Sequence, residues 1–514
     1  MRVKRWQAPP ERLLNPMTHT QEGNAMRHWW DEVTLSLRSG VSLEQLPPLP
    51  EIATGTASAE HTLHGWSPLL EGLQGQGQPV MSLVQRLPPE QHAQGLAYLA
   101  QLDGLGLLAF GIGDGSRSWV SLQPMVQGSL GVLRPIDSTQ TYRLSRFAFV
   151  RRLGAWSVLE SPRVPALLRL DEPLVGTLLL HLNGPSLQTR WASTIAAEGM
   201  MSERVTAERV TTGERLATLE ALFGLLVTSG FLVACDPHGL SEEEQQATLA
   251  TWSFHELLFH RRSRPGNHAF PVGKTWPFKG IFEPLPALRP RHPQVIRELP
   301  LEKPPVSGQN SPEPSLFELL ERRRSERVHG TQPLSFSALS ALLYHALRVQ
   351  ETLPLTPGSG YEVTRRPYPS GGASYDLEVY LITGACEQLE PGLYHYDPAA
   401  HALHMLTGET PALQTLRLEA MSNCGVSSSP QLLLCLASRF QRMSWSYQNM
   451  PYAITLKNAG VVYQTLYLVA TALGLACCGM GRGNSTLFAQ AAGLDELEET
   501  TVGELIIGSH DNQS

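Results

Sequence analysis

Residues 442–509 read RMSWSYQNMPYAITLKNAGVVYQTLYLVATALGLACCGMGRGNSTLFAQAAGLDELEETTVGELIIGS, and this stretch decides the fold of the C-terminal third. Its order is a polar segment, a long apolar helix, a glycine-rich turn, a short helix and a closing strand. No charged residue occurs from Asn458 to Gly481. Because Gln464 and the break at Gly474 argue against a membrane span, we expect a helix buried between protein layers or subunits.

The residues before this stretch predict strands. RRPYPSGGASYDLEVYLI (365–382) places a tight Pro-Ser-Gly-Gly loop ahead of an apolar strand, and QLLLCLA (431–437) is a second strand. Glycines without side chains let backbone N–H groups approach a flat ring closely. GLYHYDPAAHALHML (392–406) is a hairpin by pattern, so His395 and His404 are expected to be strand residues without a catalytic role.

A basic helix end lies at the start of the same domain. Ser315 and Glu318 have the spacing of a capping box, and the helix they open ends in ERRRSERVHG (321–330). The arginines Arg322, Arg323, Arg324 and Arg327, together with the Ser325 hydroxyl, could hold a phosphate by charge-assisted hydrogen bonds. Taken alone, the pattern is also that of a solvated basic helix end favoured by the helix dipole.

The N-terminal half has two helix-rich patterns that end in strands. The alternating SWVSLQPM (118–125) follows the turn GIGDGS, and YRLSRFAFVRRLGAWSVLESP (142–162) gives two further strands around Gly154. We expect a flexible arm and two winged-helix-like modules, followed by an extended linker rich in proline. The expected boundaries are 1–26 for the arm, 27–138 and 139–262 for the modules, and 263–314 for the linker.

Composition excludes several classes of protein. The net charge of −7 gives no general attraction to nucleic acid, and no long basic run compensates for it. The six cysteines have no CxxC spacing, so we expect reduced thiols and no metal. His255 and His260 are five residues apart and therefore point in different directions around a helix, unlike the ligands of a zinc protease. A secretory signal is not expected, which favours the cytoplasm.

RRRSERV (322–328), YPSGGASYDLEVY (368–380) and residues 442–509, in this order, resemble flavin oxidoreductases of the nitroreductase fold. The resemblance is to the branch that oxidises thiazolines and oxazolines in ribosomal peptides, which includes the McbC-like and SagB-like dehydrogenases and the cyanobactin oxidases. LSRFAFVRR (144–152) and WSFHELLFHRRSR (252–264) resemble the N-terminal half of the cyanobactin oxidases. The implied fold is α+β, with a dimeric nitroreductase-like domain of a mixed sheet and helices at 315–514, after two winged-helix-like modules for peptide recognition.

The resemblance also implies an FMN site at a dimer interface. One group of residues would hold the phosphate and ribityl chain, a second would line the isoalloxazine ring, and a third would approach it from the turn after the long helix. These groups are Arg323, Arg324, Ser325 and Arg327; Pro369, Ser370, Gly371 and Gly372; and Gly479, Met480 and Gly481.

Oxidation of an azoline removes a proton and a hydride from adjacent carbons, so the site needs a base on one side and the flavin on the other. In the family this base is a neighbouring Lys-Tyr pair, and the matching position here is Ser446-Tyr447. Tyr447 is our candidate for proton transfer, with a packing tyrosine as the alternative. Ser446 stands where the family has the lysine, so its positive charge is missing. Lys457 is the candidate to supply that charge, with a surface or ion-pairing role as its alternative.

The leading hypothesis is an azoline dehydrogenase that uses dioxygen to reoxidise FMN and acts on a precursor peptide after a cyclodehydratase. The first rival is a nitro or quinone reductase fed by a nicotinamide, which would use the same flavin pocket. The second is a peptide-binding scaffold that has lost its chemistry, prompted by Ser446. The sequence does not reveal the peptide or whether sulfur or oxygen rings are preferred.

Overall fold

The computed structural model divides the chain into two compact units. The first is formed by Met1–Arg261 with Gly266–Ala269, and the second by Arg262–Pro265 with Phe270–Ser514. The expected arm at 1–26 lies outside the described residues. The described ranges are 33–38, 41–47, 59–74, 77–113, 117–126, 136–197, 212–304, 314–353 and 361–511.

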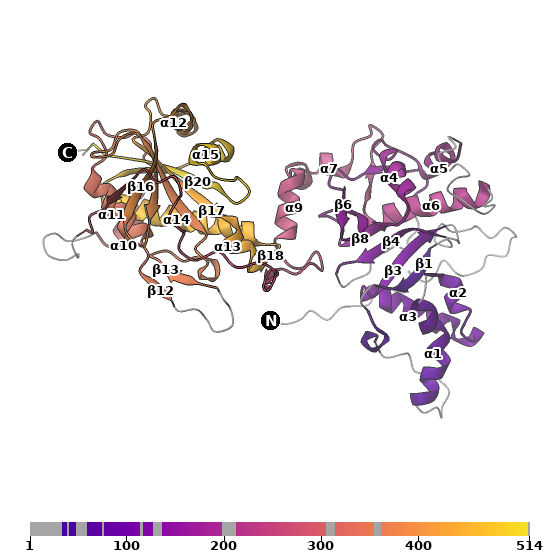
Figure 1. The fold of residues 1–514 in the computed structure, drawn as a ribbon. Helices are drawn as coiled ribbons and strands as arrows, with labels where there is room; N and C mark the ends of the chain where they lie inside the picture. Colours follow the sequence, from indigo (N-terminus) through magenta and orange to yellow (C-terminus); the bar gives the residue numbers. More distant parts are fainter. Residues whose placement is uncertain are drawn as a thin grey trace. The chain divides into compact units, whose positions relative to one another are not determined.

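In the described part of the N-terminal unit, seven strands form an antiparallel sheet in the order β2-β1-β3-β4-β8-β7-β6 (Figure 1). β4 pairs with β8, so strands from both sides of residue 138 share one sheet. The winged-helix description of the two halves stays a prediction. The strands are β1 (Thr34–Leu37), β2 (Gln78–Pro79), β3 (Leu108–Gly113), β4 (Ser118–Pro124), β6 (Phe149–Leu153), β7 (Trp156–Glu160) and β8 (Ala166–Leu170), and a separate pair is β5 (Thr141–Leu144) with β9 (Leu232–Cys235).

Helices of the N-terminal unit pack against this sheet through one continuous apolar core. Trp66, Leu122, Leu168 and Phe223 come from distant parts of the unit and belong to the same buried cluster. The helices are α1 (Ala59–Gln74), α2 (Val80–Val84), α3 (His92–Gly104), α4 (Pro173–Leu180), α5 (Gln188–Ala197), α6 (Thr212–Ser229), α7 (Glu242–Gln245), α8 (Ala247–Ala250) and α9 (Phe254–Arg262).

The C-terminal unit has a second antiparallel sheet, whose described strands follow the order β11-β16-β15-β14-β17-β20-β19. The hairpin expected at 392–406 is confirmed as β15 and β16. The strands are β11 (Arg297–Pro300), β14 (Leu377–Thr383), β15 (Gly392–Asp397), β16 (Ala402–Gly408), β17 (Leu432–Arg439), β19 (Ala476–Gly479) and β20 (Glu499–Gly508), with the small pairs β10 (Gly273–Lys274) with β18 (Tyr447–Gln448) and β12 (Glu351–Leu353) with β13 (Val363–Arg365).

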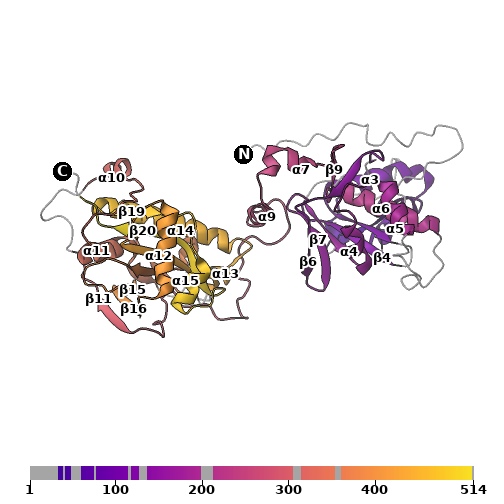
Figure 2. The same cartoon turned by 90° about the horizontal axis from the view of Figure 1, so that it is seen from above.

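Helices cover both faces of this sheet (Figures 1 and 2). Successive side chains of a strand point to opposite faces. Val379 and Leu381 therefore share a core with α11 and α14, whereas Tyr380 and Ile382 share a core with α12 and α15. The unit is α+β, as expected, but the described strands of its main sheet pair antiparallel throughout and do not form the mixed sheet that we expected. Its helices are α10 (Leu316–Arg322), α11 (Phe336–Leu347), α12 (Pro411–Cys424), α13 (Phe440–Ser444), α14 (Pro451–Ala472) and α15 (Ser485–Ala492).

The segment from Phe270 to Leu301 differs from the extended linker that we expected over 263–314. β10 pairs with β18, and β11 extends the main sheet by pairing with β16. The Trp445 indole N–H also donates to the Phe282 carbonyl at 2.7 Å. Proline and arginine enrichment predicted an unpaired chain, but these residues belong to the C-terminal unit; the residues 305–313 lie outside the described part.

Candidate functional site

The glycine corner, residues Pro369–Tyr375, leads into β14. Its backbone is left-handed at Gly372 (φ 61°), Ala373 (φ 54°) and Tyr375 (φ 44°). Residues other than glycine rarely adopt this conformation, and such strain is concentrated at functional sites. The Tyr375 backbone N–H donates to the Ser370 hydroxyl at 3.1 Å and fixes the turn.

Both glycines of the corner are required by close neighbours. A β-carbon at Gly371 would overlap the side chain of Ile454, and one at Gly372 would overlap the hydroxyl oxygen of Tyr447. The glycines therefore let the backbone approach α14 on one side and β18 on the other. This close packing is the physical reason for glycine at both positions.

A buried carboxylate fixes the corner to α14. Asp376 accepts hydrogen bonds from the Ser438 hydroxyl at 2.8 Å, the Thr455 hydroxyl at 2.7 Å and the Asn458 amide at 2.7 Å. The Asn458 carbonyl oxygen in turn accepts the Gly371 N–H at 3.0 Å. Because the Asp376 side chain has no exposed surface, these donors replace the water that its charge would otherwise need.

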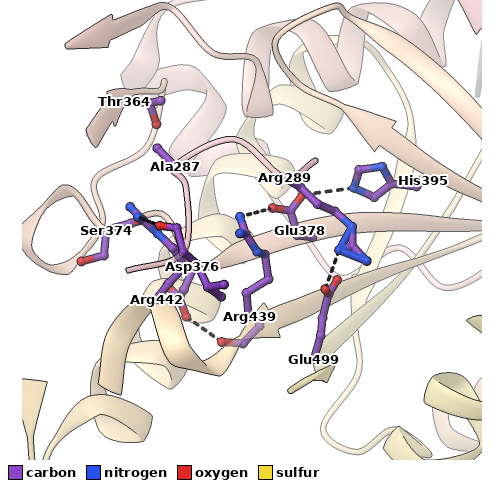
Figure 3. A network of polar contacts seen from close by, with 12 residues as sticks. Ala287, Arg289, Thr364, Ser374, Asp376, Glu378, His395, Arg439, Arg442 and Glu499 are labelled. Atoms are coloured by element: carbon purple, nitrogen blue, oxygen red, sulfur yellow. Dashed lines mark hydrogen bonds and ion pairs between the residues drawn. The ribbon is translucent and has the colours of Figure 1, made fainter. Parts of the chain in front are cut away.

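A network of buried charges ties the strands together behind this corner (Figure 3). The Glu378 carboxylate accepts from His395 at 3.0 Å and from Arg439 at 3.3 Å. Burial opposes its ionisation, but the hydrogen bond and charge of His395 and the charge of Arg439 outweigh burial and lower the Glu378 pKa to about 2. Arg289 pairs with Glu499 at 2.9 Å and joins the Phe270–Leu301 segment to β20.

Arg442 on α13 connects the same segment to the glycine corner. Its fully buried guanidinium donates to the carbonyls of Ser374 at 2.7 Å, Leu285 at 2.6 Å and Glu362 at 2.9 Å. It also lies over the Tyr361 ring, 4.2 Å from the centroid. The planar fork of arginine suits this bridging of several carbonyl groups.

Tyr447 faces the corner, whereas Ser446 does not. The Ser446 side chain is fully buried and its hydroxyl donates to the Met443 carbonyl at 3.5 Å. Burial raises the pKa of the Tyr447 phenol, and the neighbouring Tyr361 raises it further. Lys274 lies opposite Tyr447 in the β10–β18 pair.

The arginine segment, residues Arg322–Val328, meets the other end of α14. The Ser325 hydroxyl is 3.1 Å from the Tyr467 hydroxyl, which accepts the Gly479 N–H at 2.7 Å. The Arg323 guanidinium lies 5.3 Å from the centroid of the Tyr467 ring. The structure thus brings together residues that the sequence placed in two separate groups.

The remaining predicted residues have mixed environments. Arg324 and Arg327 are exposed, and Arg324 lies 3.7 Å from Glu326 in a surface ion pair. Met480 is buried, whereas Pro369 and Gly481 are exposed. Guanidinium groups that reach solvent remain available to an anion.

The glycine corner and the arginine segment are joined by α14. Asn458 contacts the first and Tyr467 the second, and nine residues of helix separate them by about 13.5 Å. Lys457 lies on the exposed side of α14. Among the described residues, no hydrogen bond or ion pair joins Lys457 to Tyr447.

Two further findings concern ligands and membranes. In the described residues, no group of three histidines, cysteines or acidic residues is placed to hold a metal ion. None of the described helices combines the length and the apolar character that a membrane crossing requires.

Comparisons with known proteins identify the family of the C-terminal unit. Residues 320–509 match the model of the nitroreductase family. A protein of Methanocaldococcus jannaschii named as a nitroreductase is 30% identical over 166 residues, which cover 32% of this chain and 78% of that protein. The chain belongs to the nitroreductase family. Its C-terminal unit is therefore an oxidoreductase domain.

One other match lies outside this nitroreductase-family domain, and a second relative is named for the processing of a peptide. Residues 142–269 match the family model described as cyanobactin oxidase ThcOx. The microcin B17-processing protein McbC of Escherichia coli is 32% identical over 147 residues, covering 28% of this chain and 50% of McbC. The chain thus spans about half the length of this relative.

Among solved structures, the E. coli microcin synthetase McbBCD complex with truncated pro-MccB17 contains a similar chain. It is 24% identical, with coverage of 46% of this chain and 90% of that chain and a TM-score of 0.30.

Sequence reasoning missed the residues that hold the candidate site in place. Asp376, Asn458 and Arg442 act through contacts between distant parts of the chain. The available signal for Asn458 was an amide side chain within a long, mostly apolar helix, where a buried polar group needs hydrogen-bond partners. Lys274 was hidden in a segment interpreted as a linker.

Proposed function

We propose that this chain is an FMN-dependent dehydrogenase that converts thiazoline or oxazoline rings of a ribosomally made peptide into thiazoles or oxazoles. The observation that carries the proposal is the presence, in one chain, of a nitroreductase-family domain and a region that matches the cyanobactin oxidase model. The similarity to a protein named for microcin B17 processing supports a peptide substrate.

The residues present fit FMN. Arg323, Arg324, Ser325 and Arg327 supply guanidinium and hydroxyl donors of the kind that bind a phosphate. Pro369, Ser370, Gly371 and Gly372 form a corner without bulky side chains, suited to a flat ring. Gly479 ends β19, and Met480 and Gly481 follow it. The contacts of Tyr467 with Ser325 and Gly479 hold this turn beside the arginine segment.

The chemistry divides between cofactor and protein. When bound, FMN supplies the oxidant that accepts the hydride from one ring carbon, and dioxygen takes the electrons from it afterwards. Tyr447 would take the proton from the adjacent carbon as its own phenolic proton leaves to a neighbouring base, because its hydroxyl contacts the glycine corner on the proposed ring side. The arginine segment and the corner orient the two reacting groups.

A homodimer is part of the proposal. α10 has no buried residue, and it exposes Leu316, Phe317 and Leu320. Tyr452 and Leu456 on α14 expose further apolar surface. A second copy that covers these side chains would remove apolar area from water.

The partners follow from the order of reactions. The substrate must already carry azoline rings, so a cyclodehydratase that makes them acts before this chain. We assign binding of the precursor peptide to the N-terminal unit, where the cyanobactin oxidase match begins.

The test is incubation of the purified protein with an azoline-bearing peptide under air. We expect a yellow protein and the loss of two hydrogen atoms per ring, measured by mass spectrometry. Turnover of nitroarenes with NADPH and no change in the peptide would favour the nicotinamide-dependent reductase. A colourless protein that binds the peptide would favour the scaffold.

A further inference from the structure

Lys274 reaches the candidate site from outside the segment that matches the nitroreductase family. It belongs to β10, and β10 pairs with β18 so that Lys274 lies opposite Tyr447. The backbone N–H of Trp276 donates to the Ser446 carbonyl at 3.1 Å and continues this attachment. The chain holds Lys274 beside the tyrosine through main-chain pairing, even though the two residues are far apart in sequence.

The surroundings of the Lys274 amine are aromatic. Its Nζ lies 4.6 Å from the ring centroid of Trp276, 5.7 Å from that of Tyr361 and 5.8 Å from that of Tyr447. Among the residues that the structure describes, no carboxylate forms an ion pair with it. Ring faces attract an ammonium ion but do not accept its proton, so these ring faces do not compete as proton acceptors.

The Lys274 amine and the Tyr447 hydroxyl converge on one point. A β-carbon built on Gly372 would lie 3.3 Å from Lys274 Nζ and would overlap the Tyr447 hydroxyl oxygen. Both polar atoms therefore face the same position of the glycine corner, which is the proposed ring side of the site. The buried Ser446 contributes nothing there.

We propose that Lys274 and Tyr447 together form the proton-accepting pair of the site, an inference that rests on the proposed function. The Tyr447 oxygen takes the proton from the ring carbon while its own phenolic proton passes to the Lys274 amine. Among the described residues no hydrogen bond joins these two groups, so the Lys274 side chain would move toward the Tyr447 hydroxyl for the transfer. The hydride from the adjacent carbon goes to the flavin oxidant. The resulting ammonium returns its proton to solvent, which the exposed Lys274 side chain reaches.

The electrostatics favour a lysine that acts as a base. Partial burial lowers the pKa of Lys274, and the Arg442 guanidinium lowers it further. Arg442 on α13 and the phenols of Tyr361 and Tyr447 are the titratable or charged groups that face the amine. Because the neutral amine is the active form, activity should be lost as the pH falls through the Lys274 pKa.

The first test compares Lys274→Met, Lys274→Arg and the control Lys279→Met on the same segment. We expect kcat for azoline oxidation to fall roughly 100-fold in Lys274→Met, with FMN still bound. Lys274→Arg should not rescue the rate, because a guanidinium does not act as a base at these pH values. The limb of the pH profile that rises with pH in the wild type should disappear in Lys274→Met and remain in Lys279→Met.

A second test needs no turnover. Limited acetylation of the whole protein, followed by peptide mass spectrometry, should modify Lys274 faster than Lys279 at neutral pH, because only a neutral amine reacts. Equal labelling of the two lysines would overturn the Lys274–Tyr447 pair but not the proposed function. The same holds if the wild type is active and Lys274→Met has the same pH profile. A wild type that leaves the azoline unchanged overturns the proposed function and the pair with it.

Discussion

The glycine corner and the arginine segment lie beside the same helix, α14, but they are built differently. The corner is held by the buried Asp376, which accepts three side-chain hydrogen bonds. The arginine segment is held by Ser325, by Arg323 over Tyr467 and by the Glu326 N–H, which donates to a β19 carbonyl at 3.0 Å. Most of its guanidinium groups reach solvent.

Because of this difference, we expect the corner to determine the stability of the C-terminal unit and the arginine segment to determine its affinity for FMN. A substitution behind the corner leaves buried donors without acceptors, and this lowers the free energy of unfolding. A change in the arginine segment removes an exposed charge, and exposed charges contribute little to folding. Variants in the two regions should therefore affect different measurements.

Asp376→Leu should have the largest effect. It leaves the donors of Ser438, Thr455 and Asn458 without their acceptor, and the C-terminal unit should lose about 3 kcal/mol or more of unfolding free energy. Calorimetry of the thermal transition measures the loss. The control Thr455→Val removes one of the three hydrogen bonds and should cost about 1 kcal/mol; equal losses in the two variants would show that Asp376 does not organise the corner.

Tyr447→Phe should slow oxidation of the azoline roughly 100-fold, because proton transfer by a positioned group contributes at least that much. The phenyl ring keeps the packing, so flavin absorbance and thermal stability should stay at wild-type values. Tyr344→Phe on α11 is the matched control for loss of a phenol. Full activity in Tyr447→Phe would remove this residue from the mechanism.

Arg323→Ala and Arg327→Ala should weaken FMN binding by about 1.5 to 3 kcal/mol each, through loss of a charge-assisted contact to the phosphate. Fluorescence titration of flavin-free protein with FMN measures the change. The melting temperature without FMN should stay close to that of the wild type. Arg291→Ala, which removes an exposed guanidinium paired with Glu298, should bind FMN normally. Wild-type affinity in both test variants would refute the phosphate assignment.

The sequence predicted the parts of the molecule that depend on local patterns. The capping box at Ser315 is confirmed, since its hydroxyl accepts the Glu318 N–H at 3.3 Å. The predicted long apolar helix corresponds to α14, and the predicted hairpin at 392–406 corresponds to the β15–β16 pair. Motifs of glycines or arginines at short spacing can be recognised in a sequence because their chemistry does not depend on distant partners.

The rest depends on contacts between distant residues. Lys274 lies opposite Tyr447 because β10 pairs with β18. No local pattern in a proline-rich segment predicts such a pairing. The same limit applies to Arg442, whose carbonyl partners come from three separate stretches. Lys457 was chosen for its nearness in sequence, but helix geometry places it on the exposed side of α14.

The smallest effects are expected for two glycine substitutions, which distinguish backbone strain from steric crowding at the corner. Gly372 (φ 61°) and Gly425 (φ 65°) have nearly the same backbone conformation, but a β-carbon at Gly425 meets no atom within 4 Å. Gly425→Ala should therefore cost only the left-handed strain of about 1 kcal/mol. Gly372→Ala adds the displacement of the Tyr447 hydroxyl, so it should also reduce kcat. If both variants lose the same stability and keep wild-type kcat, the corner does not set the position of Tyr447.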